Sequence, residues 1–387
     1  MKKSRFAALV ALAVVVSVVA RVGVSASQAF SASSEVVGQV YVNDNTTGVN
    51  TVAGLDRHAD GSLTPIPGSP FTVGGAGAGH ADASQGSLQL STDARYLLAV
   101  DAGSNQISVL RIKPDGSLRI ADVVSSNGGN PVSIAVNGDL VYVANADPDD
   151  PNYTGFTLNP GGHLREIPGS TVSLPAGSQP GDVLFSGDRT KLVGTRVGTS
   201  LIDSFTVGTD GLLTAAPGSP FEHQIGVYGQ FGSEFNPVNP AQLFVSNAHT
   251  AANGPAPGSV SAYTDAADGT LTPIGASPFA NVGVASCWVE ISHDGRYLFT
   301  VNTASSTIAS YSVGDGGTLI AIGNTAIKNG KGAEDARLSP DGSTLWVVSS
   351  GADAVNAFSV NGGTLTEITN SPTTGPANAT PSGIVVT

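Results

Sequence analysis

The sequence predicts an all-β protein, a seven-bladed β-propeller with four-stranded antiparallel blades. Three observations predict it: a short glycine turn followed by leucine recurs seven times, a second strand pattern recurs between these turns, and the two ends of the chain complement each other. Successive turns lie roughly 46 to 58 residues apart, the range of propeller blades and longer than most helical solenoid repeats. The seven turns are Asp60–Leu63, Asp115–Leu118, Gly161–Leu164, Asp210–Leu213, Asp268–Leu271, Gly316–Leu319 and Gly362–Leu365.

Each glycine-leucine turn separates two runs of alternating apolar and polar residues. Ile107–Ile112 and Ser117–Ile120, for example, flank the turn at Asp115. Alternation on both sides of Asp-Gly or Gly-Gly is a strong hairpin signal, so these runs are expected to form the outer half of each blade.

A second pattern supplies the inner half of each repeat. An apolar run leads into a turn such as Ser292–Gly295 or Ser339–Gly342, and a β-branched and aromatic run such as Tyr297–Asn302 follows. These residue types suit a pleated, buried surface. Each repeat therefore contributes four strands, as a propeller blade requires.

The ends of the chain predict how the ring closes. Gln39–Asn43 begins at the second strand of a blade, and the missing first strand appears at the other end as Ser382–Thr387. Pairing these two segments would remove the exposed edges of an open sheet.

The first residues differ in kind from the repeats. Lys2, Lys3 and Arg5 precede an apolar run too short to cross a bilayer, and Val24–Ala26 offers small residues for cleavage. We expect a signal peptide over residues 1–26, with cleavage after Ala26, Ala29 or Ala32 left open, a short leader over 27–37 and the propeller over 38–387. The protein is then secreted or extracytoplasmic, with no membrane span after signal removal.

Composition limits the classes of partner. A formal net charge of −13 with scattered Lys and Arg argues against nucleic acid. No cofactor motif is present, and we expect a monomer. The acidic run Asp147–Asp150 could offer oxygens to a hard cation but lacks EF-hand spacing, so a solvated loop is favoured and a metal requirement stays unknown. Cys287 is the only cysteine, which favours a small buried hydrophobe.

The succession of apolar strand, Ser-Pro-Asp-Gly-like turn, Tyr-Val-Ala-Asn-like strand and Gly-Gly-Thr-Leu-like hairpin resembles the lactonase family of seven-bladed propellers over about residues 38–387. That family includes 6-phosphogluconolactonase and carboxymuconate-lactonizing enzymes, and related Tyr-Val-Thr-Asn repeats occur in bacterial surface proteins. The resemblance implies a site around the central channel. It also implies a His-rich segment before an inner strand, where this chain has only His80 in one blade and Ser286–Glu290 in another.

Candidate catalytic residues follow from their positions in the loops and strand starts around the channel. Glu222 and His223, followed by Tyr228 and Glu234, form the densest local group. A histidine beside a carboxylate could act as general base or acid on a lactone ester, or such residues could bond the loop backbone. Glu290 occupies a matching inner-strand position.

Arg196 is the exception among the residues that end the second strands. The others, Asp44, Asp101, Asn145, Asn247, Asn302 and Ser349, suit turn capping. A guanidinium there could hold a substrate carboxylate or an oxyanion, or could pair with Asp182 or Asp188. Both interpretations stay open.

The sequence thus indicates an exported lactonase-like propeller that hydrolyses or forms a small lactone, with His223, Glu234, Arg196 and Glu290 as candidate catalytic residues. The alternative is a non-catalytic extracellular propeller that binds a protein or a glycan; the lack of a histidine pair favours it. Since the phosphorylated sugar lactone belongs inside the cell, export favours a different substrate.

Overall fold

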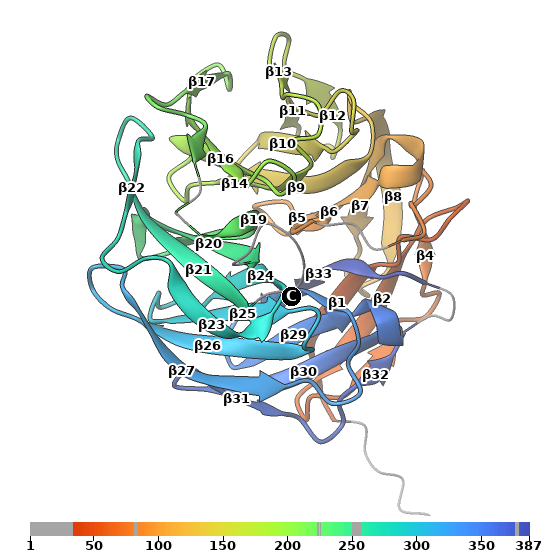
Figure 1. The fold of residues 1–387 in the computed structure, drawn as a ribbon. Helices are drawn as coiled ribbons and strands as arrows, with labels where there is room; N and C mark the ends of the chain where they lie inside the picture. Colours follow the sequence, from red (N-terminus) through yellow and green to blue (C-terminus); the bar gives the residue numbers. More distant parts are fainter. Residues whose placement is uncertain (1–33, 81–83, 223, 225, 250–256, 376–378) are drawn as a thin grey trace, which may run out of the picture. The chain divides into compact units, whose positions relative to one another are not determined.

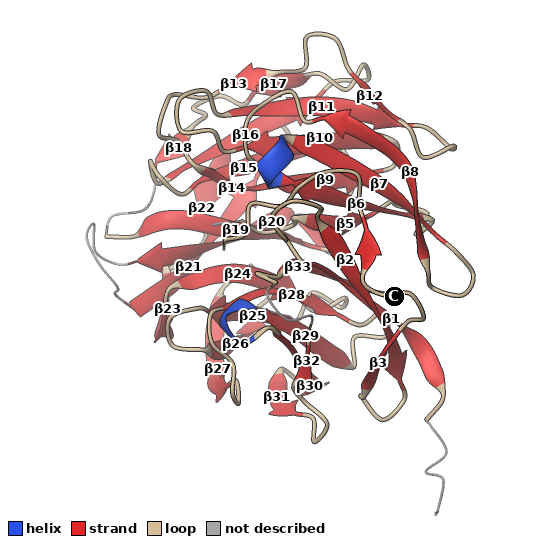
Figure 2. Cartoon of the chain, turned by 90° about the vertical axis from the view of Figure 1, so that its right-hand side faces the viewer, coloured by secondary structure: helices blue, strands red, loops and turns tan. Residues whose placement is uncertain are grey.

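The computed structural model describes residues 34–80, 84–222, 224, 226–249, 257–375 and 379–387. Residues 34–387 form one unit of seven antiparallel sheets, the blades, arranged around a centre (Figure 1). The expected signal peptide lies outside the described residues. The two short 3-10 helices, Ala102–Ser104 and Ser350–Ala352, are the only helices of the described part (Figure 2).

The blades are numbered from 1 to 7 along the chain, and the strands of each are taken from the centre outward. The innermost strands of blades 1 to 7 are β33 (Ser382–Val386), β5 (Leu88–Leu90), β9 (Pro131–Asn137), β14 (Pro180–Phe185), β19 (Tyr228–Asn236), β24 (Ser286–Ile291) and β28 (Ala333–Leu338). The second strands are β1 (Val36–Asn43), β6 (Tyr96–Asp101), β10 (Leu140–Asn145), β15 (Lys191–Arg196), β20 (Asn239–His249), β25 (Tyr297–Asn302) and β29 (Thr344–Ser349).

The outer strands meet at the glycine-leucine turns, which confirms the predicted hairpins. The third strands are β2 (Thr51–His58), β7 (Gln106–Ile112), β11 (Asn152–Leu158), β16 (Leu201–Val207), β21 (Pro257–Asp265), β26 (Thr307–Val313) and β30 (Ala354–Asn361). The fourth strands are β3 (Leu63–Pro65), β8 (Leu118–Ser125), β12 (Leu164–Glu166), β17 (Leu213–Ala215), β22 (Leu271–Pro273), β27 (Leu319–Ala326) and β31 (Thr364–Glu367).

In five blades the outer edge is interrupted and resumes as an additional strand beside the third. These strands are β4 (Phe71–Thr72), β13 (Val172–Ser173), β18 (Phe221–Glu222), β23 (Phe279–Val284) and β32 (Thr373–Thr374). Proline cannot donate to a strand ladder, and a turn containing it lies at the break in each case. A serine of that turn accepts the third-strand amide instead: Ser69 Oγ accepts from Gly54 at 2.9 Å and Ser219 Oγ from Ser204 at 3.0 Å.

The ring is closed as the sequence predicts. β33 pairs antiparallel with β1, with Tyr41 opposite Val385 and Val42 opposite Ile384. Each innermost strand packs beside that of the next blade, and β28 lies beside β33. β1 begins at Val36, slightly before the expected start of the propeller at residue 38.

The core lies between neighbouring blades. The largest apolar cluster joins blades 5, 6 and 7 through buried side chains such as Trp288, Phe299, Phe358 and Leu345. Cys287 belongs to this cluster, and burial raises the pKa of its thiol to about 12. This confirms the interpretation of Cys287 as a small buried hydrophobe.

Candidate functional site

Charged side chains of the innermost strands meet near the centre of the ring. In six blades the register of the innermost strand shifts near its start, a β-bulge that re-aims the side chains after it. Asp182 of β14 and Asp335 of β28 lie close to these shifts. Glu234 of β19, Glu290 of β24 and Arg337 of β28 lie further along their strands, at equivalent positions in blades 5, 6 and 7.

Arg337 binds carboxylates from three strands. Its Nη1 lies 3.0 Å from Oε2 of Glu290, 3.4 Å from Oε1 of Glu234 and 4.0 Å from Oδ1 of Asp335. The side chains of Arg337, Glu234 and Glu290 are 17, 19 and 11% exposed, whereas that of Asp335 is 1% exposed. The first three are therefore partly exposed to solvent, whereas Asp335 is not. We call Arg337, Glu234, Glu290, Asp335 and Asp182 the channel cluster.

Burial dominates the electrostatics of the channel cluster. It raises the pKa of Glu234 well above the usual range and also raises those of Glu290 and Asp335, while Arg337 opposes each shift. Burial disfavours the guanidinium charge as well, but Asp335, Glu290 and Glu234 together raise the pKa of Arg337. Carboxyl groups whose pKa values are raised by burial beside a permanent cation suit acid–base chemistry.

Asp182 is held by the strands on either side of it. Its Oδ2 accepts hydrogen bonds from the backbone amide and hydroxyl of Ser233 at 2.9 and 2.6 Å, and its Oδ1 accepts from the Ser133 hydroxyl at 3.2 Å. Burial raises its pKa to about 7 despite these bonds. Asp182 thus links blades 3, 4 and 5, and its side chain is buried from solvent.

Residues 84–87, which precede β5, cross the centre of the ring; we call them the central segment. Gln85 donates from its backbone amide to Gly181 at 2.8 Å and from Nε2 to the Ser233 carbonyl at 3.0 Å, and its Oε1 accepts from the Val289 amide at 2.9 Å. Gln85 Nε2 also lies 3.4 Å from Oε1 of Glu234. The side chain of Gln85 therefore helps to position a carboxylate of the channel cluster.

The rest of the central segment reaches the remaining blades. The Trp288 indole donates to the Ser84 carbonyl at 2.6 Å, and the Ile134 amide to the Gly86 carbonyl at 3.0 Å. Gly86 donates to Asp335 at 3.4 Å, and Ser87 to the Ser382 hydroxyl at 3.3 Å. Four consecutive residues thus bond to all six other blades.

The structure brings together two of the four predicted catalytic residues, Glu234 and Glu290. His223 lies outside the described residues. Glu222 lies on β18 at the outer edge of blade 4, opposite Leu201, so it does not share the channel with Glu234. The repeat pattern also places Arg337, Asp335 and Asp182 at inner-strand entrances around the centre, but the sequence did not single them out or indicate which residues they contact.

Arg196 occupies a bracing position that recurs around the ring. The residue that ends the second strand, or in blade 1 the residue just after it, bonds to the residue seven positions later, near the start of the third strand. The pairs are Asp44–Thr51, Asp101–Ser108, Asn145–Asn152, Arg196–Asp203 and Ser349–Asn356. In blade 4 the bond is a buried ion pair, with Nε of Arg196 2.6 Å from Oδ2 of Asp203, which also accepts from the Tyr153 hydroxyl at 3.0 Å. The partner is Asp203 rather than Asp182 or Asp188, and this geometry favours a structural role.

Replacing Arg196 should therefore reduce stability. Arg196→Met leaves the carboxylate of Asp203 buried without its cation, which costs about 3 kcal/mol of unfolding free energy. The double variant Arg196→Met/Asp203→Leu should recover part of the loss, because no unpaired charge remains. Urea unfolding of the two single variants and the double variant measures the coupling. Additive losses would argue that the pair is not the stabilising unit.

Stability should rise as the pH falls from 8 to about 5.5. Burial raises the pKa of Asp182 and Asp44 to about 7 and of Asp101 and Asp265 to about 6, above their unfolded values near 4. The folded state then binds more protons than the unfolded state across this window, so unfolding free energy decreases with rising pH. Melting temperatures at the two pH values test this, and Asp182→Asn should flatten the dependence. A melting temperature that is higher at pH 8 would contradict it.

Among the described residues, no group of three or more His, Cys, Asp or Glu is arranged to hold a metal ion. At the acidic run, Oδ1 of Asp147 accepts the backbone amide of Asp149 at 2.9 Å and that of Asp150 at 3.3 Å, which is an ordinary Asx turn. No helix in the described part of the chain is long and apolar enough to span a membrane.

Comparison with known proteins adds family information. Residues 49–185 and 237–381 match the family model described as lactonase, 7-bladed β-propeller. Among solved structures, a Bacteroides uniformis protein provisionally designated a 6-phosphogluconolactonase is 18% identical with a TM-score of 0.73, covering 90% of this chain and 99% of its own. The periplasmic gluconolactonase of Pseudomonas aeruginosa is 16% identical with a TM-score of 0.72, covering 90% and 98%. No curated protein matches the chain.

Proposed function

The chain belongs to the lactonase family of seven-bladed β-propellers, and from this premise we propose that it hydrolyses or forms a small lactone at the channel cluster. The observation that carries the proposal is the contact of Arg337 with Glu234 and Glu290, three partly exposed groups from three blades. Two carboxyl groups beside one guanidinium supply both proton transfer and charge stabilisation.

The reaction assigns one task to each group. A carboxylate, Glu234 or Glu290, takes a proton from water as the water oxygen attacks the lactone carbonyl carbon. The guanidinium of Arg337 stabilises the negative charge that develops on the carbonyl oxygen. The ring C–O bond then breaks, and the leaving alkoxide takes the proton from the carboxylic acid. Ring closure of the hydroxy acid runs through the same steps in reverse.

The hydrogen bonds of Arg337 leave two of its nitrogen atoms available for a substrate. Within the described residues, its side chain donates to Glu234, Glu290 and the Ala336 carbonyl through Nη1 alone. A guanidinium carries five N–H donors, so Nη2 and Nε can serve a substrate oxygen. The carboxylates meanwhile fix the orientation of the guanidinium before substrate binds.

Charge supports an uncharged lactone as substrate. The channel cluster contains four carboxyl groups and one guanidinium. A phosphate group would bring about two negative charges into this surrounding, and the resulting repulsion would weaken its binding. An exported protein would also encounter neutral lactones rather than phosphorylated metabolites, in keeping with the secreted location proposed from residues 1–26.

Turnover measurements test the proposal. The purified protein is assayed against sugar, aromatic and acyl lactones, with and without a chelator. Glu234→Gln and Glu290→Gln should each lower kcat/KM for the best substrate by about 10²- to 10⁴-fold, the usual contribution of a general base or acid. Glu222→Gln, at the outer edge of blade 4, is the matched control and should retain activity.

Activity lost in Glu222→Gln but kept in both channel variants would place the site elsewhere. Absence of turnover across the whole panel would favour the non-catalytic alternative, a propeller that binds a protein or glycan.

A further inference from the structure

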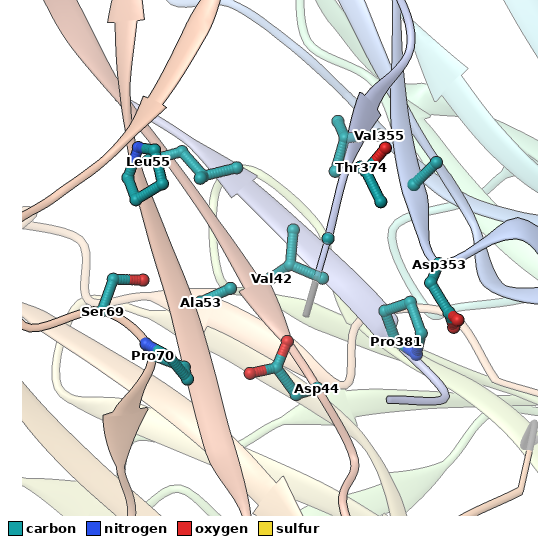
Figure 3. Close-up of a pocket in the computed structure, with 13 residues that line it drawn as sticks. Val42, Asp44, Ala53, Leu55, Ser69, Pro70, Asp353, Val355, Thr374 and Pro381 are labelled. Atoms are coloured by element: carbon teal, nitrogen blue, oxygen red, sulfur yellow. The ribbon is translucent and has the colours of Figure 1, made fainter. Parts of the chain in front are cut away.

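A separate apolar cavity lies where the first and last blades meet. Its volume is about 200 Å³, and Val42, Ala53 and Leu55 of blade 1 and Val355 of blade 7 line it (Figure 3). Cavities of about 150 Å³ with apolar walls bind benzene-sized molecules, so this one can take a ring with a short substituent. None of the channel cluster lines it, so it is distinct from the proposed lactone site.

A carboxylate with an unused acceptor forms one wall of this cavity. Asp44 is fully buried, and its Oδ2 accepts from the Thr51 hydroxyl at 2.6 Å. Its Oδ1 accepts no hydrogen bond from any described residue. Figure 3 shows the Asp44 carboxylate beside Val42 and Pro70 at the cavity. A buried acceptor without a donor costs free energy that a ligand could recover.

The next blade shows that this open acceptor is not required by the fold. Asp101 holds the equivalent position at the end of its second strand, and both of its oxygens are satisfied, by Ser108 at 2.6 Å and Asn50 at 3.0 Å. Asp44 has the matching bond to Thr51 but lacks the second donor. Oδ1 of Asn145, at the same position in blade 3, also accepts no hydrogen bond from a described residue, but among these positions only Asp44 lines the cavity.

We propose that this cavity binds a small organic ammonium, with its apolar body among Val42, Leu55 and Val355 and its N–H groups donating to Asp44. Asp353, at the other side of the cavity, is the second acidic residue of the lining, and no lysine or arginine lines it. Ser69 and Thr374 add two hydroxyl groups to the lining, and the rest of it is apolar. Two carboxyl groups and a mostly apolar wall favour a cation with a hydrocarbon body over an anion or a sugar.

Three probes of one size separate the parts of the proposal: benzylamine carries an ammonium, benzyl alcohol a neutral donor, and toluene no donor. Calorimetric titration of the full chain at pH 8 should give affinities in that order, with benzylamine at least 10-fold tighter than toluene. Burial raises the pKa of Asp44 to about 7, so benzylamine affinity should fall at pH 5.5 while that of toluene stays constant.

Two variants make the test specific. Asp44→Asn should weaken benzylamine at least 10-fold and leave toluene unchanged, whereas Ala53→Leu should fill the cavity and abolish binding of all three probes. Asp353→Asn, the matched acidic control, should weaken benzylamine less than Asp44→Asn. Equal affinities of benzylamine and toluene, or benzylamine binding that survives Ala53→Leu, would overturn the proposal. Lactone turnover is read separately, because the channel cluster is unchanged in these variants.

Discussion

Removal of residues 382–387 is expected to destabilise the protein by an amount comparable to its entire unfolding free energy. The lost strand carries Ile384, Val385 and Val386, which are 0, 4 and 8% exposed. Burial of each such side chain contributes about 1.5–3 kcal/mol, so together they approach the roughly 5–15 kcal/mol that stabilise a typical domain. The deletion also uncovers β1, which would then present an unpaired edge.

Thermal melting of the chain ending at Pro381, compared with the full chain, measures this effect. A matched pair of point variants separates burial from chain length: Ile384→Ala should cost about 2–5 kcal/mol, whereas Ile320→Ala, at a side chain 66% exposed, should cost little. If the shortened chain melted with the full chain, closure by β33 would contribute nothing to stability.

Replacement of Arg337 should produce the second large effect. Arg337→Met removes the cation that faces Glu234, Glu290 and Asp335 and leaves these carboxyl groups to repel one another in a buried setting. Loss of one partner of a buried ion pair costs about 3–5 kcal/mol, and three carboxylates share this one. At pH 8 the variant should therefore unfold at a much lower denaturant concentration than the parent.

The pH dependence of this loss identifies its cause. Because burial already raises the pKa values of the three carboxyl groups, they take up protons well above pH 4 once Arg337 is gone. The difference in unfolding free energy between variant and parent should then shrink between pH 8 and pH 5. Arg296→Met is the control, since among the described residues that exposed arginine forms an ion pair only with Asp294, lies over the Tyr297 ring at the surface, and should contribute under about 1 kcal/mol. A loss independent of pH would indicate packing rather than charge.

The fold could be predicted because its signals are local and repeated. Turns such as Asp115–Leu118 determine a hairpin from four neighbouring residues, and seven copies at blade spacing leave few alternative architectures. The closure of the ring could also be predicted, because the strand at Gln39–Asn43 lacks an inner neighbour in its own repeat and Ser382–Thr387 supplies one.

The channel cluster could not be predicted in the same way, because it depends on contacts distant in the sequence. Arg337 is 47 positions from Glu290 and 103 from Glu234. Whether an inner-strand side chain faces the channel depends on the β-bulge before it, and one residue of register reverses the face. Glu234 and Glu290 could be selected individually, but their meeting at Arg337 needed the structure.

A spacing pattern in the sequence indicates the structural role of Arg196. In several blades a polar residue follows the end of the second strand by seven positions and hydrogen-bonds to the residue at that end. Thr51 donates to Asp44 in this way, and Ser108 donates to Asp101. The same spacing leads from Arg196 to Asp203. Gln85, in contrast, belongs to no repeat, because the central segment occurs once and replaces the start of an inner strand.

The central segment restricts how this architecture can change in size. Propellers built only from neighbouring contacts can gain or lose a blade by duplication or deletion, since each interface resembles the next. Here Ser84, Gln85, Gly86 and Ser87 bond to every other blade, and each bond has a different partner. A six- or eight-bladed derivative would change the diameter of the centre and would leave several of these donors and acceptors without partners. The number of blades is thus tied to four residues at the centre, and new variants are more readily obtained in the outer turns than in the repeat count.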